Sequence, residues 1–381
     1  MEGPVHAHPF VIGLLYEFAD VSVDNALDQF TEPLQLRFDE AAASGELDRP
    51  VELVVRQGVG LPEGTAKAVE RAWLELAEAG ALAIVGPGNT DSVLAVKPLA
   101  EAHGIPTINF SGSERTRGAF NFHFQLGSLP EEGPLLARAI GSRGVRRLAV
   151  IRDRSPIGDE YFSYFDEARS DEGVAIVFDQ KVSPVEEDLQ SVVAAARSSG
   201  ADGLLYLGIG LVLGRITRAT KALGWHPPAF ANSAGSRWYW GSDEDRALAE
   251  GWVYVDMCDE LNEPAQAMLD RYEQRYGRRP TSPIPFGMYD IATLIVRALR
   301  LATVHTPRGV MEGLERIHQL PATCGGAGTV QGFGPWERTA LKGPDLLVLR
   351  QMRGGASRRY AGHPPSYEAH AERAGALAEP G

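Results

Sequence analysis

The sequence predicts an α/β fold built from two similar lobes, each with a doubly wound parallel sheet of the Rossmann type. Short apolar runs alternate with amphipathic segments over residues 10–110, an order typical of parallel strands covered by helices. The same order returns after residue 147. At roughly 150 residues per domain, a chain of 381 residues is long enough for both lobes.

The first copy of the repeat begins at residue 10. Its strands are expected at residues 11–15, 51–55, 81–85 and 106–110, with one helix running to about residue 45 and two more at residues 65–79 and 92–103. Gly80 and Gly104 follow the second and third helices, where glycine commonly ends a helix. The pattern therefore predicts parallel strands joined by helical crossovers.

The second copy has the same arrangement. After a connecting helix at 131–141, strands are expected at residues 147–151, 174–178, 204–207 and 229–231, with helices at residues 160–172, 189–198 and 208–224. In both copies a glycine (Gly86, Gly208) follows the third strand, and the fourth strand ends in a small polar loop. We interpret this as an internal duplication. The remaining strands, at 251–257 and 346–349, and helices, at 264–276, 285–302 and 308–317, are expected to complete the sheets.

The composition excludes some classes of protein. Acidic residues outnumber Lys and Arg by 50 to 37, which gives a net charge of −13. An acidic chain without a basic run is a poor match to nucleic acid, so no nucleic-acid partner is expected. The longest uncharged apolar stretch, residues 203–214, is about half of the roughly 20 residues that a membrane-spanning helix needs. We therefore expect a globular protein without a membrane span.

Two features bear on the cellular compartment. Cys258 and Cys324 are too few for a disulfide framework or a zinc site, so we expect buried free thiols, with one bridge in an oxidising compartment as the alternative. The first eight residues lack the basic and apolar stretches of a secretory leader. The protein is therefore expected to be cytoplasmic if Met1 is its native start, and extracytoplasmic if a leader has been removed.

Motifs of several common enzyme classes are absent from the sequence, including GxSxG, GxxxxGK[ST], HExxH and CxxC. Gly208, Gly210 and Gly214 follow a strand, but their spacing is one residue too long for a dinucleotide-binding turn, and no acidic residue ends the next strand. A packed turn is the better interpretation. The acidic loop that begins at Asp153 is expected to be solvated rather than a general base. We expect no catalytic residue, no metal and no cofactor.

Candidate ligand-binding residues lie in the loops after the strands. In open parallel sheets, ligands bind at the carboxyl ends of strands, where helix N-termini offer free backbone N–H groups. In the first copy these loops supply Tyr16, Asn89, Thr90, Ser111, Gly112 and Ser113, and in the second copy they supply Ile157, Ile209 and Ala234. A simpler interpretation remains open, in which Asn89 or Thr90 caps its own helix and the serines form a turn. His123 is expected to be a core or hinge residue rather than a ligand-binding one.

The order of several motifs resembles a known family. The strand at 82–86 runs into Pro87, Asn89 and Thr90, and is followed by the segments 96–106 and 111–114. Together with the segments 147–158 and 203–224 and the pair Tyr289–Asp290, these motifs are similar to the leucine/isoleucine/valine-binding family of type I periplasmic binding proteins, the solute receptors of ABC importers. The resemblance covers residues 10 to 354.

The resemblance implies two Rossmann-like lobes joined by a three-segment hinge, which closes over one small molecule. Lobe 1 would consist of residues 10–124 and 256–334, and lobe 2 of residues 125–255 and 335–354, followed by a disordered tail at 355–381. The crossings would fall near residues 122–125, 252–256 and 331–335. The implied partners are a small-molecule ligand and the membrane permease subunits of an ABC importer, and the implied location is the periplasm.

The resemblance also implies how a ligand is held. In this family the residue at Thr90 and the loop of Ser111, Gly112 and Ser113 bind the α-carboxylate of an amino acid. This chain has residues of the same type at these positions. Amino-acid-binding members place aromatic residues where this chain has Ile157 and Ile209, and an acidic partner for the ammonium where it has Ala234. An ammonium buried without a counter-charge costs several kcal/mol. We therefore expect a ligand with a carboxylate or similar acceptor group and an apolar or aromatic body, rather than a free α-amino acid.

Three functions are compatible with these features. The first is a solute-binding receptor that delivers its ligand to a permease and performs no chemistry. The second is a cytoplasmic ligand sensor on the same fold, similar to the amide-binding regulators that resemble this family. The third is an enzyme that uses the Gly208 turn with a nucleotide, which the missing acidic partner disfavours. We expect the first function.

Overall fold

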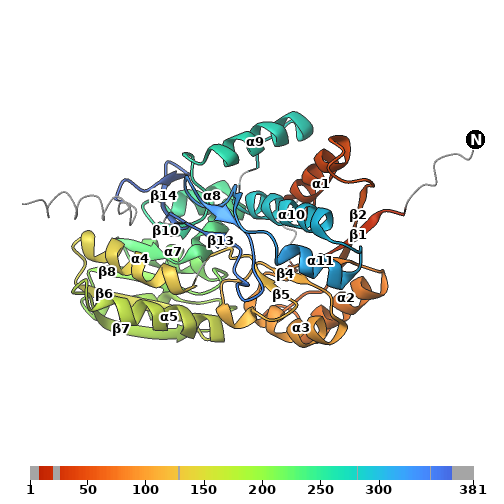
Figure 1. The fold of residues 1–381 in the computed structure, drawn as a ribbon. Coiled ribbons are helices and arrows are strands. Elements are labelled where there is room, and N and C mark those ends of the chain that lie inside the picture. Colours follow the sequence, from red (N-terminus) through yellow and green to blue (C-terminus); the bar gives the residue numbers. More distant parts are fainter. Residues whose placement is uncertain (1–7, 20–25, 128, 281, 344, 363–381) are drawn as a thin grey trace, which may run out of the picture. The chain divides into compact units, whose positions relative to one another are not determined.

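The computed structural model describes residues 8–19, 26–127, 129–280, 282–343 and 345–362. The chain divides into two compact units (Figure 1). Unit 1 consists of Met1–Leu126, Glu263–Cys324 and Val330–Leu341, and unit 2 of Gly127–Asn262, Gly325–Thr329 and Lys342–Gly381. These units differ from the predicted lobes chiefly at residues 256–262, which belong to unit 2, and at residues 335–341, which belong to unit 1.

Unit 1 contains a parallel sheet of five strands. Its strands are β1 (Phe10–Tyr16), β2 (Val51–Gln57), β3 (Ala83–Val85), β4 (Thr107–Asn109) and β5 (Asn121–His123), in the order β2-β1-β3-β4-β5. All four neighbouring pairs run parallel. The apolar run of β1 is almost wholly buried, as expected for a central strand of a parallel sheet covered on both faces.

The helices of unit 1 cover this sheet and extend beyond it. They are α1 (Asp28–Ala43), α2 (Ala66–Glu78), α3 (Thr90–His103), α9 (Glu263–Tyr276), α10 (Ile284–Leu301), α11 (Pro307–Leu314) and the short 3₁₀ helix η1 (Glu114–Thr116). Helix α2 begins after Thr65, whose hydroxyl accepts the N–H of Ala68. Its buried Trp73 donates Nε1–H to the hydroxyl of Thr107 at 3.1 Å, which connects α2 to β4.

Unit 2 contains a mixed sheet of seven strands. These are β6 (Arg147–Asp153), β7 (Ala175–Val182), β8 (Gly203–Leu207), β9 (Ala229–Ala231), β10 (Val253–Asp256), β14 (Val348–Arg353) and β15 (Ala356–Arg359), in the order β15-β14-β10-β9-β8-β6-β7. The five strands from β10 to β7 are parallel, whereas β14 and β15 run antiparallel to their neighbours. The duplicated strand order therefore forms a similar parallel core in each unit.

The helices of unit 2 follow its strands as the sequence pattern predicts. They are α4 (Leu129–Ser142), α5 (Pro156–Arg169), α6 (Gln190–Ser198), α7 (Leu213–Ala222) and α8 (Asp243–Leu248), with the 3₁₀ helix η2 (Ser233–Trp240) after β9. Helix α5 starts with Pro156, and the preceding Ser155 accepts the N–H of Gly158 at 3.2 Å. Proline at the first helical position and serine before it are both favourable at a helix N-terminus.

Several details of unit 2 differ from the sequence predictions. Helix α5 begins at Pro156 rather than at residue 160, and helix α8 was not predicted. Helix α7 begins at Leu213 rather than at Gly208, so residues 208–212 form a loop. A side chain at Gly208 would overlap Asp153 and the hydroxyl of Tyr206, which confirms a tightly packed turn. Strand β15 pairs with β14 over four residues, so the start of the tail predicted to be disordered is an ordered strand. Residues 363–381 of that tail lie outside the described part of the chain.

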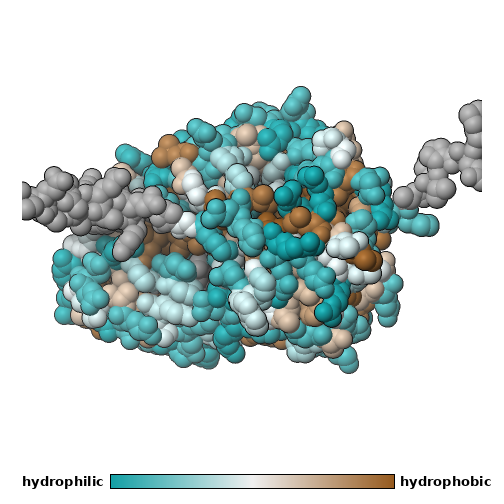
Figure 2. All heavy atoms as spheres, in the orientation of Figure 1, coloured by the Kyte–Doolittle hydropathy of each residue, from teal (hydrophilic) through white to brown (hydrophobic). Residues whose placement is uncertain are grey.

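The rest of the chain adds short strands and a largely hydrophilic surface. Strands β11 (Leu320–Pro321) and β12 (Val330–Gln331) pair antiparallel within unit 1, and β13 (Leu341–Lys342) spans its last boundary. Figure 2 shows hydrophilic side chains over most of one face, with apolar atoms in scattered groups. Among the helices that the structure describes, none has the length and apolar character needed to cross a membrane.

Candidate functional site

The candidate residues of unit 1 lie at one edge of its sheet. Because β1, β3 and β4 are neighbouring parallel strands, the loops that follow them start at the same edge. Gly86 adopts a φ of 90°, which favours glycine, and a side chain at Gly88 would overlap the ring of Phe110. The loop before α3 is therefore packed directly against the loop that follows β4.

Glu17, a residue outside the predicted set, holds the loop before α3. The backbone N–H groups of Gly88 and Asn89 each donate to Glu17 Oε1 at 2.5 Å, and the side chain is buried. Burial raises the pKa of Glu17 to about 7, although Ser92 and the two backbone donors act in the opposite direction. The structure thus places an acid that titrates near neutral pH beside the N-terminus of α3.

The sequence placed the segment of residues 16–18 among the loops that could contact a ligand, but Tyr16 was selected from it, because no motif or spacing distinguishes Glu17. The one available signal is its place directly after the buried strand β1, where a charged residue enters the edge of the sheet that carries the other candidates. Tyr16, the predicted residue beside it, is the last residue of β1 and is buried. The side chain that reaches the α3 loop is therefore the one after the predicted position.

Asn89 and Thr90 differ in the use of their side chains. Asn89 precedes α3 but makes no side-chain capping bond; its Nδ2 donates to the carbonyl of Leu61 at 2.8 Å. The alternative in which Asn89 caps its own helix is therefore wrong. Thr90 is the first residue of α3 and is fully buried, and its Oγ1 has no hydrogen-bond partner among the described residues. A buried hydroxyl without a partner lowers the stability of the fold by about 1–3 kcal/mol. A ligand group that forms a hydrogen bond with it would therefore be stabilised at this position.

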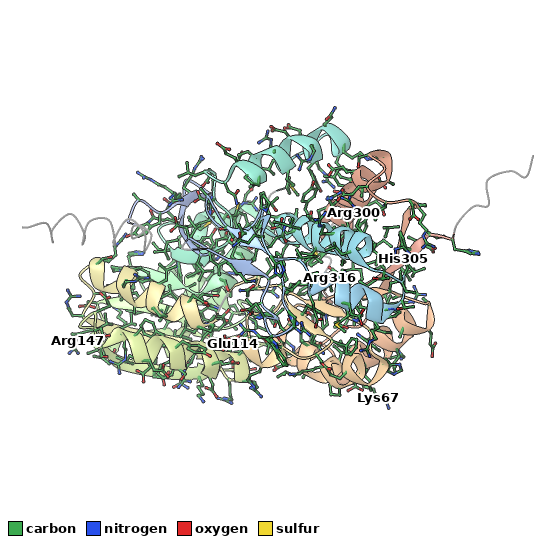
Figure 3. The ribbon with its side chains drawn as sticks, viewed as in Figure 1. Lys67, Glu114, Arg147, Arg300, His305 and Arg316 are labelled. Carbon is green, nitrogen blue, oxygen red and sulfur yellow. The ribbon has the colours of Figure 1, made fainter. Side chains whose placement is uncertain are left out.

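The serines of the loop after β4 shape the loop itself. The hydroxyl of Ser111 donates to Asn109 Oδ1 at 3.0 Å, and the Ser113 hydroxyl accepts the N–H of Arg115 at 3.3 Å. Ser113 thereby caps η1, which begins at Glu114. Glu114 is labelled in Figure 3. These bonds confirm that the serines form a turn, and the loop, with Gly112 at its centre, is buried. Any group that the loop offers to a ligand is therefore expected to come chiefly from its backbone.

An aromatic cluster lies next to these loops. Tyr16 and Phe18 both contact Phe30, with ring centroids 5.4 and 5.6 Å apart, and Phe30 contacts Phe110 at 5.9 Å. Phe18 is half-buried and the other three rings are buried. Contacts at these distances are typical of packed aromatic side chains. Unit 1 therefore combines polar loops with an apolar wall at the same edge of its sheet.

Unit 2 brings its three predicted residues to the corresponding edge of its own sheet. Because β6, β8 and β9 are neighbouring parallel strands, the segments that follow them start at one edge. Ile157 is the second residue of α5, Ile209 lies in the loop after β8, and Ala234 is the second residue of η2. Ile157 is buried, while Ile209 and Ala234 are half-buried. Gly210, with a φ of 88°, brings the backbone of the second loop against the carbonyl of Ala234. Ile209 and Ala234 thus place an apolar and a small side chain in the partly exposed part of this edge.

Asp153 is not part of a solvated loop, contrary to the sequence prediction. It is fully buried at the end of β6, where its Oδ1 accepts the hydroxyl of Tyr206 and its Oδ2 accepts the N–H of Ile209, both at 2.8 Å. Burial raises the pKa of Asp153 to about 6, and the nearby Arg237 acts in the opposite direction. Arg237 also donates Nε–H to the carbonyl of Ile209 at 2.9 Å. Asp153 and Arg237 therefore hold the Ile209 loop from two sides.

A second buried acid in unit 2 was also missed. Glu132 on α4 is fully buried; it accepts the N–H of Ser233 at 2.7 Å and the hydroxyl of Tyr161 at 3.3 Å. Its place in the first turn of a helix predicted only as a connection gave no signal of this role. Glu132 holds the start of η2, whose first two residues are Ser233 and Ala234. The 3₁₀ helix that carries Ala234 is thus anchored to an acid on another helix.

Two further features of the described residues concern metal binding and thiol chemistry. Among them, no group of three or more His, Cys, Asp or Glu side chains is placed to hold a metal ion. Cys258 is half-buried and Cys324 is buried, and the two side chains are not joined by a disulfide. Burial raises the pKa of the Cys258 thiol to about 12, so this group is protonated at neutral pH and is a poor nucleophile.

The chain is similar to one known protein family and to many solved structures. A family model described as "Periplasmic binding protein" matches residues 12–339. No protein in the curated set matches the chain. Many solved structures are similar to it; all of those described below share less than 25% of their residues with the chain, so that their likeness concerns the fold.

Three of these structures illustrate the similarity. An ABC transporter substrate-binding protein from Desulfitobacterium hafniense, in complex with Leu, is 19% identical with a TM-score of 0.77, covering 93% of this chain and 100% of that one. The branched-chain amino acid transporter substrate binding protein LivJ from Streptococcus pneumoniae, in complex with isoleucine, is 17% identical with a TM-score of 0.78. The match covers 93% of this chain and 99% of that one. A leucine binding protein LivK from Thermotoga maritima is 16% identical with a TM-score of 0.75, and the match covers 92% of this chain and 97% of that one.

Proposed function

Because the chain belongs to the periplasmic binding protein family, as its sequence motifs predict, we propose that it is the solute-binding protein of an ABC importer. In this role it binds one small organic molecule, closes over it, and delivers it to membrane permease subunits. The family model describes binding proteins, and we propose no catalytic activity. The proposed location is outside the cytoplasm, where such a receptor meets its ligand.

The observation that carries this proposal is the Thr90 hydroxyl. It is fully buried at the first residue of α3 and has no hydrogen-bond partner among the described residues. The first turn of a helix also has backbone N–H groups without intrahelical partners, and the helix dipole favours an anion there. A ligand carboxylate would accept both the hydroxyl and the N–H groups. The buried hydroxyl therefore supports a site for an acceptor group at the start of α3.

The rest of the ligand is proposed to be apolar or aromatic. Tyr16, Phe18, Phe30 and Phe110 form an apolar wall beside the Thr90 loop in unit 1. In unit 2, the segments at the corresponding sheet edge carry Ile157, Ile209 and Ala234, where the resemblance implies aromatic and acidic side chains in amino-acid-binding members. Apolar surfaces of this kind stabilise a buried hydrocarbon by roughly 25 cal/mol per Å² removed from water. We therefore propose a carboxylate with an apolar or aromatic body as the ligand.

A thermal-shift screen tests this function. The purified protein is screened against aliphatic and aromatic carboxylates, free amino acids, amides and nucleotides. A ligand at 100 times its dissociation constant adds about 2.7 kcal/mol to the free energy of unfolding, which raises the melting temperature of a protein of this size by a few degrees. A shift with carboxylates that lack an amino group supports the proposal. Shifts only with nucleotides, or with none of these compounds, contradict it.

Two variants of Thr90 locate the site. Thr90→Val removes the hydroxyl but keeps the shape of the side chain, whereas Thr90→Ser keeps the hydroxyl. We expect Thr90→Val to lose carboxylate affinity without loss of stability, because it also removes an unsatisfied buried hydroxyl. Thr90→Ser is expected to bind like the natural protein. Equal affinity in Thr90→Val would place the acceptor site elsewhere.

A further inference from the structure

His123 lies beside the loop that follows β4. It is the last residue of β5, where it pairs with Asn109 at the end of β4, and its side chain is 1% exposed. Its backbone is held on both sides, because its N–H donates to the carbonyl of Arg338 at 2.7 Å and its carbonyl accepts the N–H of Ala340 at 2.9 Å. The ring therefore occupies a fixed place next to Ser111.

The partners of the ring define its protonation. Nε2 lies 2.5 Å from the carbonyl oxygen of Ser111, and Arg117 Nε lies 3.4 Å from Nδ1. A carbonyl only accepts and a guanidinium only donates, so Nε2 carries the hydrogen and Nδ1 is bare. Burial lowers the pKa of His123 to about 4, which keeps this neutral form at physiological pH. The ring is thus a fixed donor to Ser111.

This bond sets the direction of one peptide group. In a trans peptide, the carbonyl of Ser111 and the N–H of Gly112 belong to one plane and point in opposite directions. With the carbonyl held toward His123, the N–H of Gly112 points away from the ring. Asn109 Oδ1 accepts the hydroxyl of Ser111 and, at 3.3 Å, its N–H, which restrains the preceding peptide as well. Rotation of the Ser111–Gly112 peptide would break the bond between the Ser111 carbonyl and His123.

We propose that His123 is a positioning residue for ligand binding: it holds the Ser111 carbonyl so that the Gly112 N–H is directed toward the ligand's acceptor group. The inference rests on the proposed function, because it names the residue that orients part of the proposed carboxylate site. His123 does not touch the ligand in this scheme. Its contribution is the pre-orientation of the loop, which lowers the cost of ordering the loop upon binding.

Two substitutions separate the donor role from packing. His123→Gln keeps one donor and one acceptor near the ring nitrogens, because the Gln amide N–H can donate to Ser111 and its oxygen can accept from Arg117. His123→Phe fills similar space without either group. His103→Gln, at the exposed last residue of α3, is the matched control. Each variant is first compared by hydrogen–deuterium exchange of the loop 110–113 in the ligand-free protein, and then by calorimetry with a carboxylate identified in the screen.

We expect His123→Phe to exchange its loop amides at least several-fold faster and to bind the carboxylate about tenfold more weakly, the size expected for the loss of one oriented hydrogen bond. His123→Gln and His103→Gln are expected to stay within about threefold of the natural protein in both measurements. Unchanged loop exchange in His123→Phe would overturn the positioning role, whatever the ligand.

The two measurements also distinguish the failure of this inference from the failure of the proposed function. Faster loop exchange with unchanged carboxylate affinity would overturn the inference, since the loop would then be oriented for something other than binding. If the natural protein binds no carboxylate, the proposed function fails, and the link between His123 and the ligand fails with it. Comparable losses in His123→Phe and His123→Gln would also contradict the donor role.

Discussion

The carboxyl group of Glu17 accepts the backbone N–H of Asn89, the residue that precedes helix α3, at 2.5 Å. The same oxygen accepts the N–H of Gly88, so one buried side chain fixes the whole approach to the helix. Thr90, whose hydroxyl supports the proposed ligand site, is the next residue. An acid with a pKa of about 7 therefore lies beside the position proposed for a ligand carboxylate.

The affinity for a carboxylate is expected to fall as the pH rises through about 7. Glu17 is neutral below its raised pKa and negative above it, and a negative Glu17 repels a second carboxylate nearby. We expect several-fold weaker binding at pH 8 than at pH 6, measured by calorimetry. In Glu17→Gln, which keeps an oxygen that accepts both N–H groups, the pH dependence should be smaller. Equal pH dependence in the variant and the natural protein would assign it to another group, such as Asp91, whose pKa is also raised by burial.

The stability of Glu17→Gln relative to the natural protein is expected to depend on pH. Burial raises the pKa of Glu17 from 4.5 to about 7, so the neutral form is favoured in the folded protein. The contribution of neutral Glu17 to the free energy of unfolding is fully present below pH 4.5 and is lost as the pH rises through 7. The variant should therefore melt at a similar temperature at pH 5 and at a higher temperature at pH 8, with a gain on the order of 1–3 kcal/mol. A variant that is less stable at pH 8 than at pH 5, relative to the natural protein, would contradict this.

A negative charge in the loop after β4 is expected to abolish carboxylate binding. Ser113→Asp introduces this charge while keeping an oxygen that can cap η1, as the Ser113 hydroxyl does for Arg115 N–H. Ser113→Asn has nearly the same shape and capping ability without the charge. We expect a loss of at least tenfold in affinity for Ser113→Asp and a small change for Ser113→Asn, measured by calorimetry. Similar affinities in the two variants would remove this loop from the proposed site.

An acidic side chain at position 234 is expected to extend binding to free amino acids. Ala234 is half-buried in the first turn of η2, at the position where the resemblance to amino-acid-binding members implies an acidic partner for the ammonium. Ala234→Glu supplies this counter-charge, and Ala234→Gln is its neutral control. A thermal-shift series with leucine and valine should show binding to the Glu variant only. Tight binding of leucine by the natural protein would overturn the proposed ligand class.

The local pattern of the sequence predicted most of the secondary structure and the edge of each sheet that carries candidate residues. The buried strands β1, β6 and β8 were recognisable because central parallel strands are continuous apolar runs. The start of α7 was placed too early, since the glycines at 208 and 210 form a packed turn that depends on Asp153 and Tyr206. Such a turn requires contacts that are distant along the chain, and periodicity carries no information about them.

The sequence by itself determined the order of strands and helices, the family, and the positions of Thr90, the serine loop, Ile157, Ile209 and Ala234 at the ends of strands. Only the tertiary structure decided which side chains hold these loops: Glu17 before α3, His123 beside Ser111, Asp153 under Ile209, and Glu132 behind Ser233. These four side chains lie between 12 and 101 residues along the chain from the residues that they hold, and they bond mainly to backbone atoms. Backbone partners leave no residue-type signature, so burial and hydrogen bonding in the folded chain were needed to identify them.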